Sequence, residues 1–514
     1  MKKLITSIIS LIFLANFVFA GIKVTPYGAA GIVSGSCFLV ESGSDTIVID
    51  CGLFMRDDSP EIGSDEKNSD IAQELIEAKT LILTHAHTDH CGRIPLLINK
   101  GFKGNIYCTQ ATKELTLALF KNRTGFENID RKWFWSQSQR FNAERNNNSV
   151  VIHWTNACRA SIKYLEESSG IMSLSAVKKE AGVNFYLCKD CCEWEADKVI
   201  APFFIAKKYN EEIVLSDGLK FKFINAGHVP GSASVVLNAE DKTLVFSGDL
   251  GNGYSRLTGL FEVPQKADVL FMEATYADEK YKLGFEDYEI FRRDLMKAIK
   301  HGNIVWIPAL AFNRTQKVLY EIYLMQKEGL IDKKIPVYSV SPTANALNSL
   351  YQKEADKKNG TWFLKEVYDG AIVVSKDVKQ QMVREYDSQK ILLSSSGDMD
   401  FGMSEKLANV LIPKKDVSIM IVNYVSPQST AAKLLSGKSG ASQIKNRAHA
   451  KKYDIFSDHP DFDAVCKWLE NQEKSAKIYI IHSTAKTAEK MKKMLGKKGW
   501  NNVFITAEKQ RIEI

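Results

Sequence analysis

Three histidines and an aspartate occur within six residues in the first fifth of the chain, in segment 84–90, which reads THAHTDH. In an extended turn, side chains at i and i+2 project in the same direction, so His85 and His87 are able to bind one metal ion. Asp89 and His90 then turn toward a second ion. Imidazole and carboxylate ligands suit Zn²⁺, and open coordination positions are typical of catalytic zinc. The alternative is a polar loop that happens to be rich in histidine, which this dense pattern after an apolar run disfavours.

Further metal-binding residue types follow other apolar runs. His228, Asp249 and His482 each stand at the end of a strand-like segment. Taken alone, each is more often an ordinary loop residue than a ligand, but their common placement at strand ends predicts that they join the same site. Asp50 also ends a strand-like run, and we expect it to orient a ligand by hydrogen bonding rather than to bind metal itself.

The elements that must position these residues follow an α/β pattern. Short apolar runs alternate with helical periodicity, which predicts strands whose ends carry the chemistry. The expected strands before residue 277 are 36–40, 46–50, 80–84, 219–226, 232–237, 243–247 and 269–273, with helices over 66–78 and from about 92. Between 277 and 445, helices and strands alternate in a manner typical of βαβ units and a second, parallel-sheet domain. The expected elements after 445 are a strand over 477–482, a basic helix over 485–497 and a strand over 502–505.

Length and charge narrow the functional classes. The chain has 514 residues, of which 45% are hydrophobic and 25% charged, and this length exceeds what one core usually supports, so we expect at least two domains. The formal net charge is +7, and Lys2 and Lys3 lie in an expected leader, which leaves +5 for the mature chain. This balance excludes a histone-like polycation and an acidic disordered tail. Any nucleic-acid role therefore depends on local basic patches.

The first twenty residues have the pattern of a secretory signal peptide. Lys2 and Lys3 precede an apolar run from Leu4 to Phe19, and Ala20 stands at the expected cleavage position. An uncleaved membrane anchor or a buried helix is the alternative, but the run is short for a membrane span. We therefore expect an exported protein, periplasmic or secreted, with no stable membrane association after cleavage.

The nine cysteines divide into two groups. Four of them cluster in an irregular stretch at about 125–205 that has the character of an insertion, and they are expected to form disulfides or, less favoured, a structural zinc site. These four are Cys158, Cys188, Cys191 and Cys192. The other five lie in or near apolar segments and are expected to be buried thiols.

The motifs together resemble the metallo-β-lactamase superfamily and, within it, the β-CASP group of RNA-processing nucleases. Asp50, segment 85–90, His228 and Asp249 match the first four motifs of the superfamily in order. The β-CASP marks match Glu273 in MEATY, His459 in FSDHPD and His482 in IIHS. The resemblance implies an α/β fold, an αβ/βα sandwich with an inserted parallel-sheet β-CASP domain. Its implied parts are a leader over 1–20, a sandwich over 21–276 with the insertion, the β-CASP domain over 277–445 and the rest of the sandwich over 446–514.

The resemblance also implies roles for the site residues. One zinc ion would be held by His85, His87 and His228, and a second by Asp89, His90 and His482, with Asp249 bridging the two. Such a pair activates a hydroxide that attacks the phosphorus of a phosphodiester. His459 would then protonate the leaving oxygen or stabilise its charge, and Glu273 would fix the tautomer of His459. A purely structural role for His459 is the alternative.

Two loops depart from the family pattern. The family carries arginines in two segments that resemble phosphate-binding loops, whereas the equivalents here, 397–403 and 423–433, have none, and the first contains two aspartates. Phosphate is then expected to contact the remaining candidates, which are Arg314, Ser395, Ser396, Gly397 and Lys433.

The sequence therefore predicts a zinc-dependent nuclease acting on RNA or another single-stranded nucleic acid. Because of the leader and the lost arginines, an exported metallo-hydrolase of a non-nucleic ester or amide is the alternative. An inactive zinc-binding scaffold is a third reading, disfavoured because every ligand position is filled. Whether the chain forms a homodimer is left open.

Overall fold

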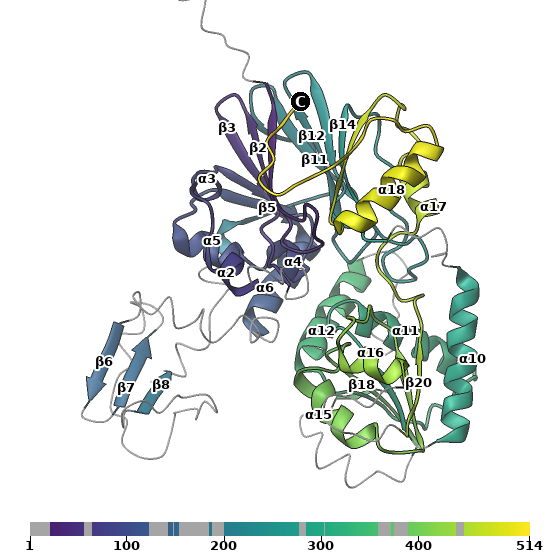
Figure 1. The fold of residues 1–514 in the computed structure, drawn as a ribbon. Helices are drawn as coiled ribbons and strands as arrows, with labels where there is room; N and C mark the ends of the chain where they lie inside the picture. The colour runs from purple at the N-terminus through teal and green to yellow at the C-terminus, as the bar shows by residue number, and fades with distance from the viewer. Residues whose placement is uncertain are drawn as a thin grey trace, which may run out of the picture.

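A computed structural model describes residues 21–55, 64–122, 142–146, 149–153, 184–187, 200–276, 284–302, 304–357, 372–374, 389–437 and 447–514. Within these residues the chain forms two seven-stranded sheets, one six-stranded sheet and one three-stranded sheet (Figure 1). The expected leader and the four clustered cysteines lie outside the described residues. Among the described residues, no helix has both the length and the apolar composition needed to cross a membrane.

The two seven-stranded sheets form a sandwich, here called the sandwich domain. The first sheet has the order β23-β1-β2-β3-β4-β5-β9. Its strands are β1 (Lys23–Gly28), β2 (Cys37–Ser42), β3 (Asp45–Ile49), β4 (Thr80–Ile82), β5 (Asn105–Thr109), β9 (Phe204–Lys207) and β23 (Ile512–Glu513). The neighbours β3, β4, β5 and β9 run parallel. An apolar cluster joins the outer face of this sheet to α3 (Gln73–Glu77) and α5 (Ile94–Lys100).

The second sheet has the order β10-β11-β12-β13-β14-β21-β22. Its strands are β10 (Ile213–Ser216), β11 (Leu219–Asn225), β12 (Ala233–Ala239), β13 (Lys242–Phe246), β14 (Val269–Glu273), β21 (Lys477–Ile481) and β22 (Val503–Ile505). Its outer face packs against α17 (Phe462–Trp468) and α18 (Ala485–Lys497). Strands β11, β13, β14 and β21 all run in the same direction, so their carboxyl ends meet at one edge of the sheet.

Aromatic side chains fill the space between the two sheets. Phe246 and Phe271, on neighbouring strands, stack with ring centroids 4.5 Å apart, and Phe38 from the first sheet lies 5.9 Å from Phe246. All three side chains are buried. Burying a phenylalanine side chain stabilises a fold by roughly 1.5–3 kcal/mol, so this core holds the two sheets, and the loops at their edges, in a fixed relation.

The six-stranded sheet lies in a separate domain, the parallel-sheet domain, below the sandwich in Figure 1. Its order is β17-β16-β18-β15-β19-β20, and every pairing is parallel. The strands are β15 (Ile304–Pro308), β16 (Val337–Ser339), β17 (Ile372–Val374), β18 (Lys390–Ser394), β19 (Val417–Ile421) and β20 (His449–Lys452). Most are continuous apolar runs such as IVWIP in β15, as expected for strands buried on both faces. The covering helices are α10 (Phe285–His301), α11 (Arg314–Lys327), α12 (Pro342–Lys357), α15 (Gly402–Leu411) and α16 (Thr430–Leu435).

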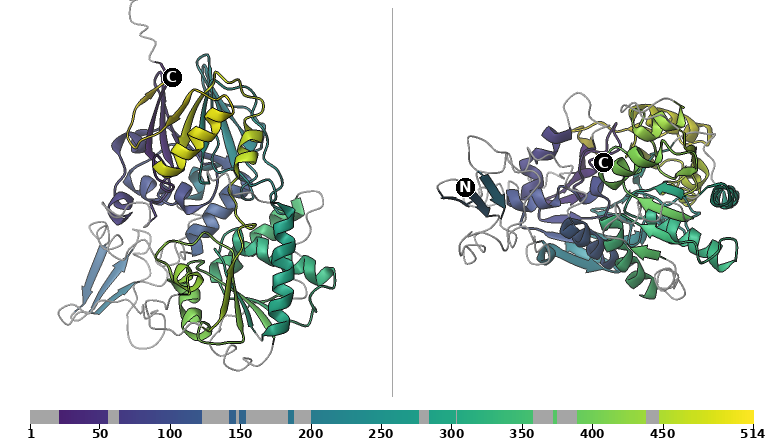
Figure 2. Two further views of the ribbon diagram at one scale, coloured as in Figure 1. Left: turned by 45° about the vertical axis from the view of Figure 1, so that its right-hand side comes forward. Right: turned by 90° about the horizontal axis from the view of Figure 1, so that it is seen from below.

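The small fourth sheet belongs to the stretch expected to be an insertion. It consists of β6 (Asn142–Asn146), β7 (Ser149–His153) and β8 (Asn184–Leu187). Figure 2 shows these three strands apart from the other sheets in both views.

The α/β fold class predicted from the sequence is confirmed, with local differences at element ends. The expected helix over 66–78 is two helices, α2 (Ser64–Ser69) and α3, because Ala72 has an extended backbone and Ile71 turns into the core. The expected strand over 80–84 ends at Ile82. The backbone N–H of Thr84 leaves the strand ladder to donate to the carboxylate of Asp50.

Candidate metal centre

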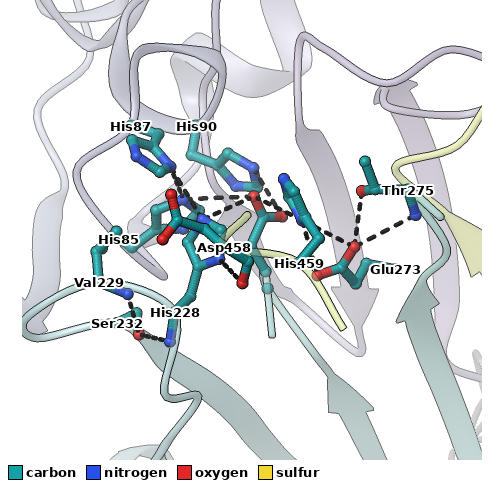
Figure 3. A network of polar contacts seen from close by, with 12 residues as sticks. His85, His87, His90, His228, Val229, Ser232, Glu273, Thr275, Asp458 and His459 are labelled. Atoms are coloured by element: carbon teal, nitrogen blue, oxygen red, sulfur yellow. Dashed lines mark hydrogen bonds and ion pairs between the residues drawn. The ribbon is translucent and has the colours of Figure 1, made fainter. Parts of the chain in front are cut away.

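The predicted metal ligands come together at one edge of the sandwich domain, in loops that follow strands of both sheets. Figure 3 shows four of them, His85, His87, His90 and His228. His85 and His87 follow β4, and α4 (Thr88–Cys91) carries Asp89 and His90. The remaining three ligands follow β11, β13 and β21, and they are His228, Asp249 and His482. Because these strands share a direction within each sheet, their carboxyl ends deliver all seven side chains to one place.

One group of ligand atoms consists of the imidazoles of His85, His87 and His228 together with Asp249. The Nδ1 atom of His87 lies 3.1 Å from Nε2 of His85 and 3.1 Å from Nε2 of His228. Asp249 Oδ2 lies 3.6 Å from Nε2 of His85 and 3.5 Å from Nε2 of His228. Four atoms from three loops, those after β4, β11 and β13, thus converge on one point.

A second group lies on the other side of the same aspartate. Asp249 Oδ1 lies 3.1 Å from Nε2 of His90 and 3.5 Å from Nε2 of His482. His482 Nε2 is also 3.3 Å from Oδ2 of Asp89. The two oxygens of Asp249 therefore face two different sets of ligands, which is the arrangement of a bridging carboxylate.

The chemistry of these donors fits a pair of metal ions. Among the described residues, His90 Nε2 and Asp249 Oδ1 are buried and, although 3.1 Å apart, form no hydrogen bond of adequate geometry with each other or with another group, a situation that costs about 1–3 kcal/mol unless something binds them. Burial lowers the pKa of His87 to about 3 and also lowers the pKa of His228. Both imidazoles are then neutral near pH 7, and neutral imidazole is the form that binds metal.

The carboxylates of the centre are held in their charged form. Burial raises the pKa of Asp249, but the neighbouring imidazoles of His482, His90 and His85 outweigh this and hold it well below its usual value. The pKa of Asp89 is likewise lowered against the effect of burial, mainly by its hydrogen bond with His482. Two ionised oxygen ligands among five imidazoles give a donor set that suits Zn²⁺.

Asp50 lies directly behind the second group of ligands. Its Oδ2 atom accepts a hydrogen bond from Nδ1 of His90 at 2.7 Å, which leaves Nε2 of that ring pointing at Asp249. The Asp50 carboxylate is fixed in turn by Ser36 and by the hydroxyl and backbone N–H of Thr84. The close packing here requires a glycine at position 52, where an added Cβ would lie 1.5 Å from the carbonyl oxygen of Asp89.

His459 lies at the rim of the centre, in the loop between β20 and α17, beside Glu273 at the end of β14 (Figure 3). Its Nδ1 atom is 3.1 Å from both carboxylate oxygens of Glu273, which also accepts from the backbone N–H of Leu250. Burial lowers the pKa of His459, but the charge and hydrogen bond of Glu273, together with Asp249, more than offset this and raise it to about 9. His459 is therefore a protonated imidazole next to the ligand cluster.

Comparison with known proteins adds the family. Residues 30–289 match the model of the metallo-beta-lactamase superfamily, and residues 315–434 match that of the Beta-Casp domain. The chain belongs to the metallo-β-lactamase superfamily. The match at 315–434 lies in the parallel-sheet domain, which is called the β-CASP domain from here on. The family resemblance predicted from the sequence is thus confirmed.

The relatives are similar over most of their length. Ribonuclease TTHA0252 of Thermus thermophilus is 25% identical, covering 93% of this chain and 96% of that protein. An RNase J-like protein of Methanocaldococcus jannaschii is 23% identical over 89% of this chain and 91% of its own. Integrator complex subunit 11 of Danio rerio is 22% identical over 92% and 70%. A solved protein of unknown function from Enterococcus faecalis V583 shares the fold, with a TM-score of 0.51, 11% identity and coverage of 96% of this chain and 100% of that one.

Two threonines in the metallo-β-lactamase centre escaped the sequence prediction. The Thr275 hydroxyl donates to Glu273 Oε2 at 2.7 Å and lies 2.9 Å from Nδ1 of His482, so one side chain connects the carboxylate behind His459 to a predicted metal ligand. Thr84 plays the same part between Asp50 and Nδ1 of His85, at 3.0 and 3.1 Å. The only sequence signal was their position next to the motif residues.

The β-CASP domain reaches the metal centre through Asp458. Asp458 is buried, and its carboxylate accepts from Asn313 Nδ2 at 2.5 Å, pairs with Lys317 Nζ and lies 3.4 Å from Arg314 Nη2. Its backbone carbonyl lies 3.1 Å from Nδ1 of His228. Side chains from the first turn of α11 therefore hold a loop that touches a predicted metal ligand.

This arrangement bears on the expectation for Arg314. The sequence predicted that Arg314 holds a phosphate, but its side chain is buried and its guanidinium donates to the carbonyl oxygen of Val422 in addition to facing Asp458. Its Nη1 and Nη2 atoms face partners within the protein, where the buried charge of Asp458 needs a counter-charge, whereas its buried Nε has no hydrogen-bond partner among the described residues.

The other phosphate candidates lie in loops after β18 and β19, in the β-CASP domain. The Ser395 hydroxyl lies 2.9 Å from that of Ser341, and the Ser396 hydroxyl is buried without a hydrogen-bond partner among the described residues. Gly397 packs against Asn423, where an added Cβ would lie 2.5 Å from the amide. Lys433 is half-buried on α16. The structure thus brings none of them into the ligand cluster.

The two aspartates of the first loop bind the second loop. The carboxylate of Asp398 accepts from the N–H and hydroxyl of Ser426, at 3.1 and 2.7 Å. Asp400 accepts in the same way from Thr430, at 2.9 and 2.6 Å. Donors of the kind that would otherwise bind a phosphate are therefore occupied by the protein's own carboxylates.

Proposed function

We propose that the chain is a zinc-dependent phosphodiesterase that holds two zinc ions and cleaves RNA or another single-stranded nucleic acid. The observation that carries the proposal is the division of Asp249, whose two oxygens face two separate sets of ligands at 3.1–3.6 Å. The ribonuclease among its relatives supports the choice of substrate class.

The residues have distinct roles in this proposal. His85, His87 and His228 would hold one ion, Asp89, His90 and His482 would hold the other, and Asp249 would contribute to both. When bound, such a pair supplies Lewis-acid activation of a water molecule and of the phosphate oxygens.

His459 acts as the general acid. The Nδ1–H group of His459 donates a hydrogen bond to Glu273, which leaves Nε2–H as the second proton of the imidazolium. Because its pKa is raised to about 9, His459 keeps that proton at neutral pH and can give it to the departing oxygen of the diester. Glu273 also stabilises the ring orientation, because Leu250 and Thr275 fix its own two oxygens.

Cleavage assays with matched substrates test the proposal. Purified protein with zinc is expected to cleave labelled single-stranded RNA, and Asp89→Ala abolishes cleavage. His459→Ala lowers RNA cleavage by about 10²–10⁴-fold, the usual contribution of a general acid. The same variant loses much less activity on bis-p-nitrophenyl phosphate, whose leaving group needs no proton. His449→Ala, which removes an exposed histidine of β20, is the control and keeps full activity.

Two other outcomes would replace the proposal. The commitment of Arg314 and the two loop aspartates to internal contacts favours a non-nucleic ester or amide as the second candidate substrate. Hydrolysis of the small diester without cleavage of RNA or single-stranded DNA would support that candidate. Bound zinc without any hydrolysis would instead indicate a scaffold.

The proposed export is tested separately, by finding the protein outside the cytosol with an N-terminus at Gly21.

A further inference from the structure

The carboxyl edge of the six-stranded sheet faces the metal centre. The chain leaves β20 at Lys452 and reaches His459 seven residues later, and all six strands run parallel to β20. After β15, the ring of Phe312 packs on that of His87 with centroids 4.8 Å apart, and Asn313 Nδ2 donates to the carbonyl of His228 at 3.3 Å. Figure 1 shows this domain directly beneath the sandwich domain. Side chains at this edge therefore border the reaction site.

Three large apolar side chains on this edge are exposed. Leu310 follows β15 and is 49% exposed, Tyr424 follows β19 and is 60% exposed, and Phe401 follows β18 and is 46% exposed. These three strands are direct neighbours in the sheet, in the order β18-β15-β19. Exposed apolar residues scattered singly need no explanation, but Leu310 and Tyr424 lie within three residues of adjacent strand ends beside a candidate active site.

A buried amide fixes two of them relative to each other. Asn423, which precedes Tyr424, accepts the backbone N–H of Leu310 at 2.9 Å through Oδ1 and donates to the carbonyl of Pro308 at 2.7 Å through Nδ2. Its side chain is itself buried. The segments that carry Leu310 and Tyr424 are thus joined side by side, so their positions are set before any ligand arrives.

We propose that Leu310 and Tyr424 form a stacking platform for one unpaired base of the strand that is cleaved at the metal centre. This inference rests on the proposed nuclease function. Every base has a flat apolar face, so an aromatic ring beside an aliphatic side chain binds a base without regard to sequence. A base-paired strand cannot offer that face, so the platform selects single strands. Leu310 lies two residues before Phe312, at the start of the turn that carries Phe312 against His87, so the stacked base lies near the nucleotide at the metals.

Abasic substitution along the substrate tests the platform. A series of short single-stranded RNAs, each lacking the base at one position, is compared with the intact RNA for binding to the full-length protein. In the wild type, one position is expected to matter, with a loss of about 5- to 150-fold, the usual range for one base on one aromatic ring. Tyr424→Ala lowers binding of intact RNA by the same factor, and in that variant the sensitive abasic position has no further effect. Tyr424→Trp restores both.

Controls separate this inference from the proposed function. Phe504→Ala removes another exposed aromatic ring, on β22 at the edge of the sandwich domain, and leaves RNA binding unchanged. Tyr424→Ala leaves hydrolysis of bis-p-nitrophenyl phosphate unchanged, because that diester has no base.

Unaltered binding of intact RNA by Tyr424→Ala, or an equal loss of binding to abasic RNA in variant and wild type, would overturn the platform without affecting the proposed nuclease function. A changed oligomeric state with unaltered RNA binding would overturn it in favour of a contact between copies. Failure of the wild type to bind or cleave any RNA would reject the proposed function itself.

Discussion

Removing the carboxylate of Asp458 is expected to destabilise the protein more than any single surface change. Asp458, Lys317 and Arg314 are only 5%, 4% and 6% exposed, and they form one charge cluster between the β-CASP domain and the metal centre. Asp458→Ala leaves two buried cations facing no anion among the residues that the structure describes. Breaking a buried ion pair in this way costs about 3–5 kcal/mol, a large part of the 5–15 kcal/mol that is typical of a folded protein.

Combining Asp458→Ala with Lys317→Met tests whether the destabilisation comes from the unpaired cations. Lys317→Met alone leaves Asp458 with Arg314 and Asn313, so it costs less than Asp458→Ala. Combining the two removes one of the stranded cations, so the double variant is expected to be at least as stable as Asp458→Ala, and the two costs do not add. Urea unfolding followed by fluorescence measures this, because Trp306 is buried in the β-CASP domain. A cost below about 1 kcal/mol for Asp458→Ala, or additive costs, would refute the reasoning.

Two further predictions concern residues around the metal centre. Thr275→Val removes the hydroxyl that connects Glu273 to His482 and is expected to lower zinc affinity or turnover by about 10–100-fold. Thr275→Ser keeps the hydroxyl and is expected to keep both properties. A competition titration with a zinc chelator measures the affinity, and unchanged affinity and turnover in Thr275→Val would contradict the role of this hydroxyl. In metal-free protein, the His459–Glu273 pair stabilises the fold fully below pH about 6.5, the unfolded pKa of histidine, and this stabilisation is lost as the pH rises through about 9. The free energy of unfolding of the wild type minus that of Glu273→Gln should therefore shrink from pH 6.5 to 9, and a difference that grows over this range would be incompatible with the raised pKa.

Local sequence spacing was sufficient to identify part of the centre. His85, His87, Asp89 and His90 are neighbours in the chain, so their pattern alone predicts a metal site. To assign His228, Asp249 and His482 to the same site, the prediction also had to assume that strand ends meet at one edge of a sheet. The family resemblance supported this assumption, because these residues match the family motifs in their order along the chain. The fold class followed from the apolar runs, because parallel strands buried on both faces are easily recognised.

The remaining parts depend on contacts between distant segments. Thr275 matters because it lies 2.9 Å from His482, a residue 207 positions away, and no local pattern reports that contact. Arg314 remained a phosphate candidate after the loop arginines were found missing, and its contact with Asp458, 144 positions further along, is not visible in the sequence. The exposed pair of Leu310 and Tyr424 is visible only once the order of the strands is known. Tertiary packing, rather than residue type, decides each of these cases.

Zinc titration of the metal-free protein tests the central claim most directly. Cleavage of single-stranded RNA is followed while zinc is added in equivalents per chain, for the wild type and for Asp249→Asn. If Asp249 joins two ions, activity rises chiefly with the second equivalent and stops there, and Asp249→Asn holds fewer than two ions and stays inactive. Full activity without metal, saturation at one equivalent, or an active Asp249→Asn variant would contradict the two-metal account.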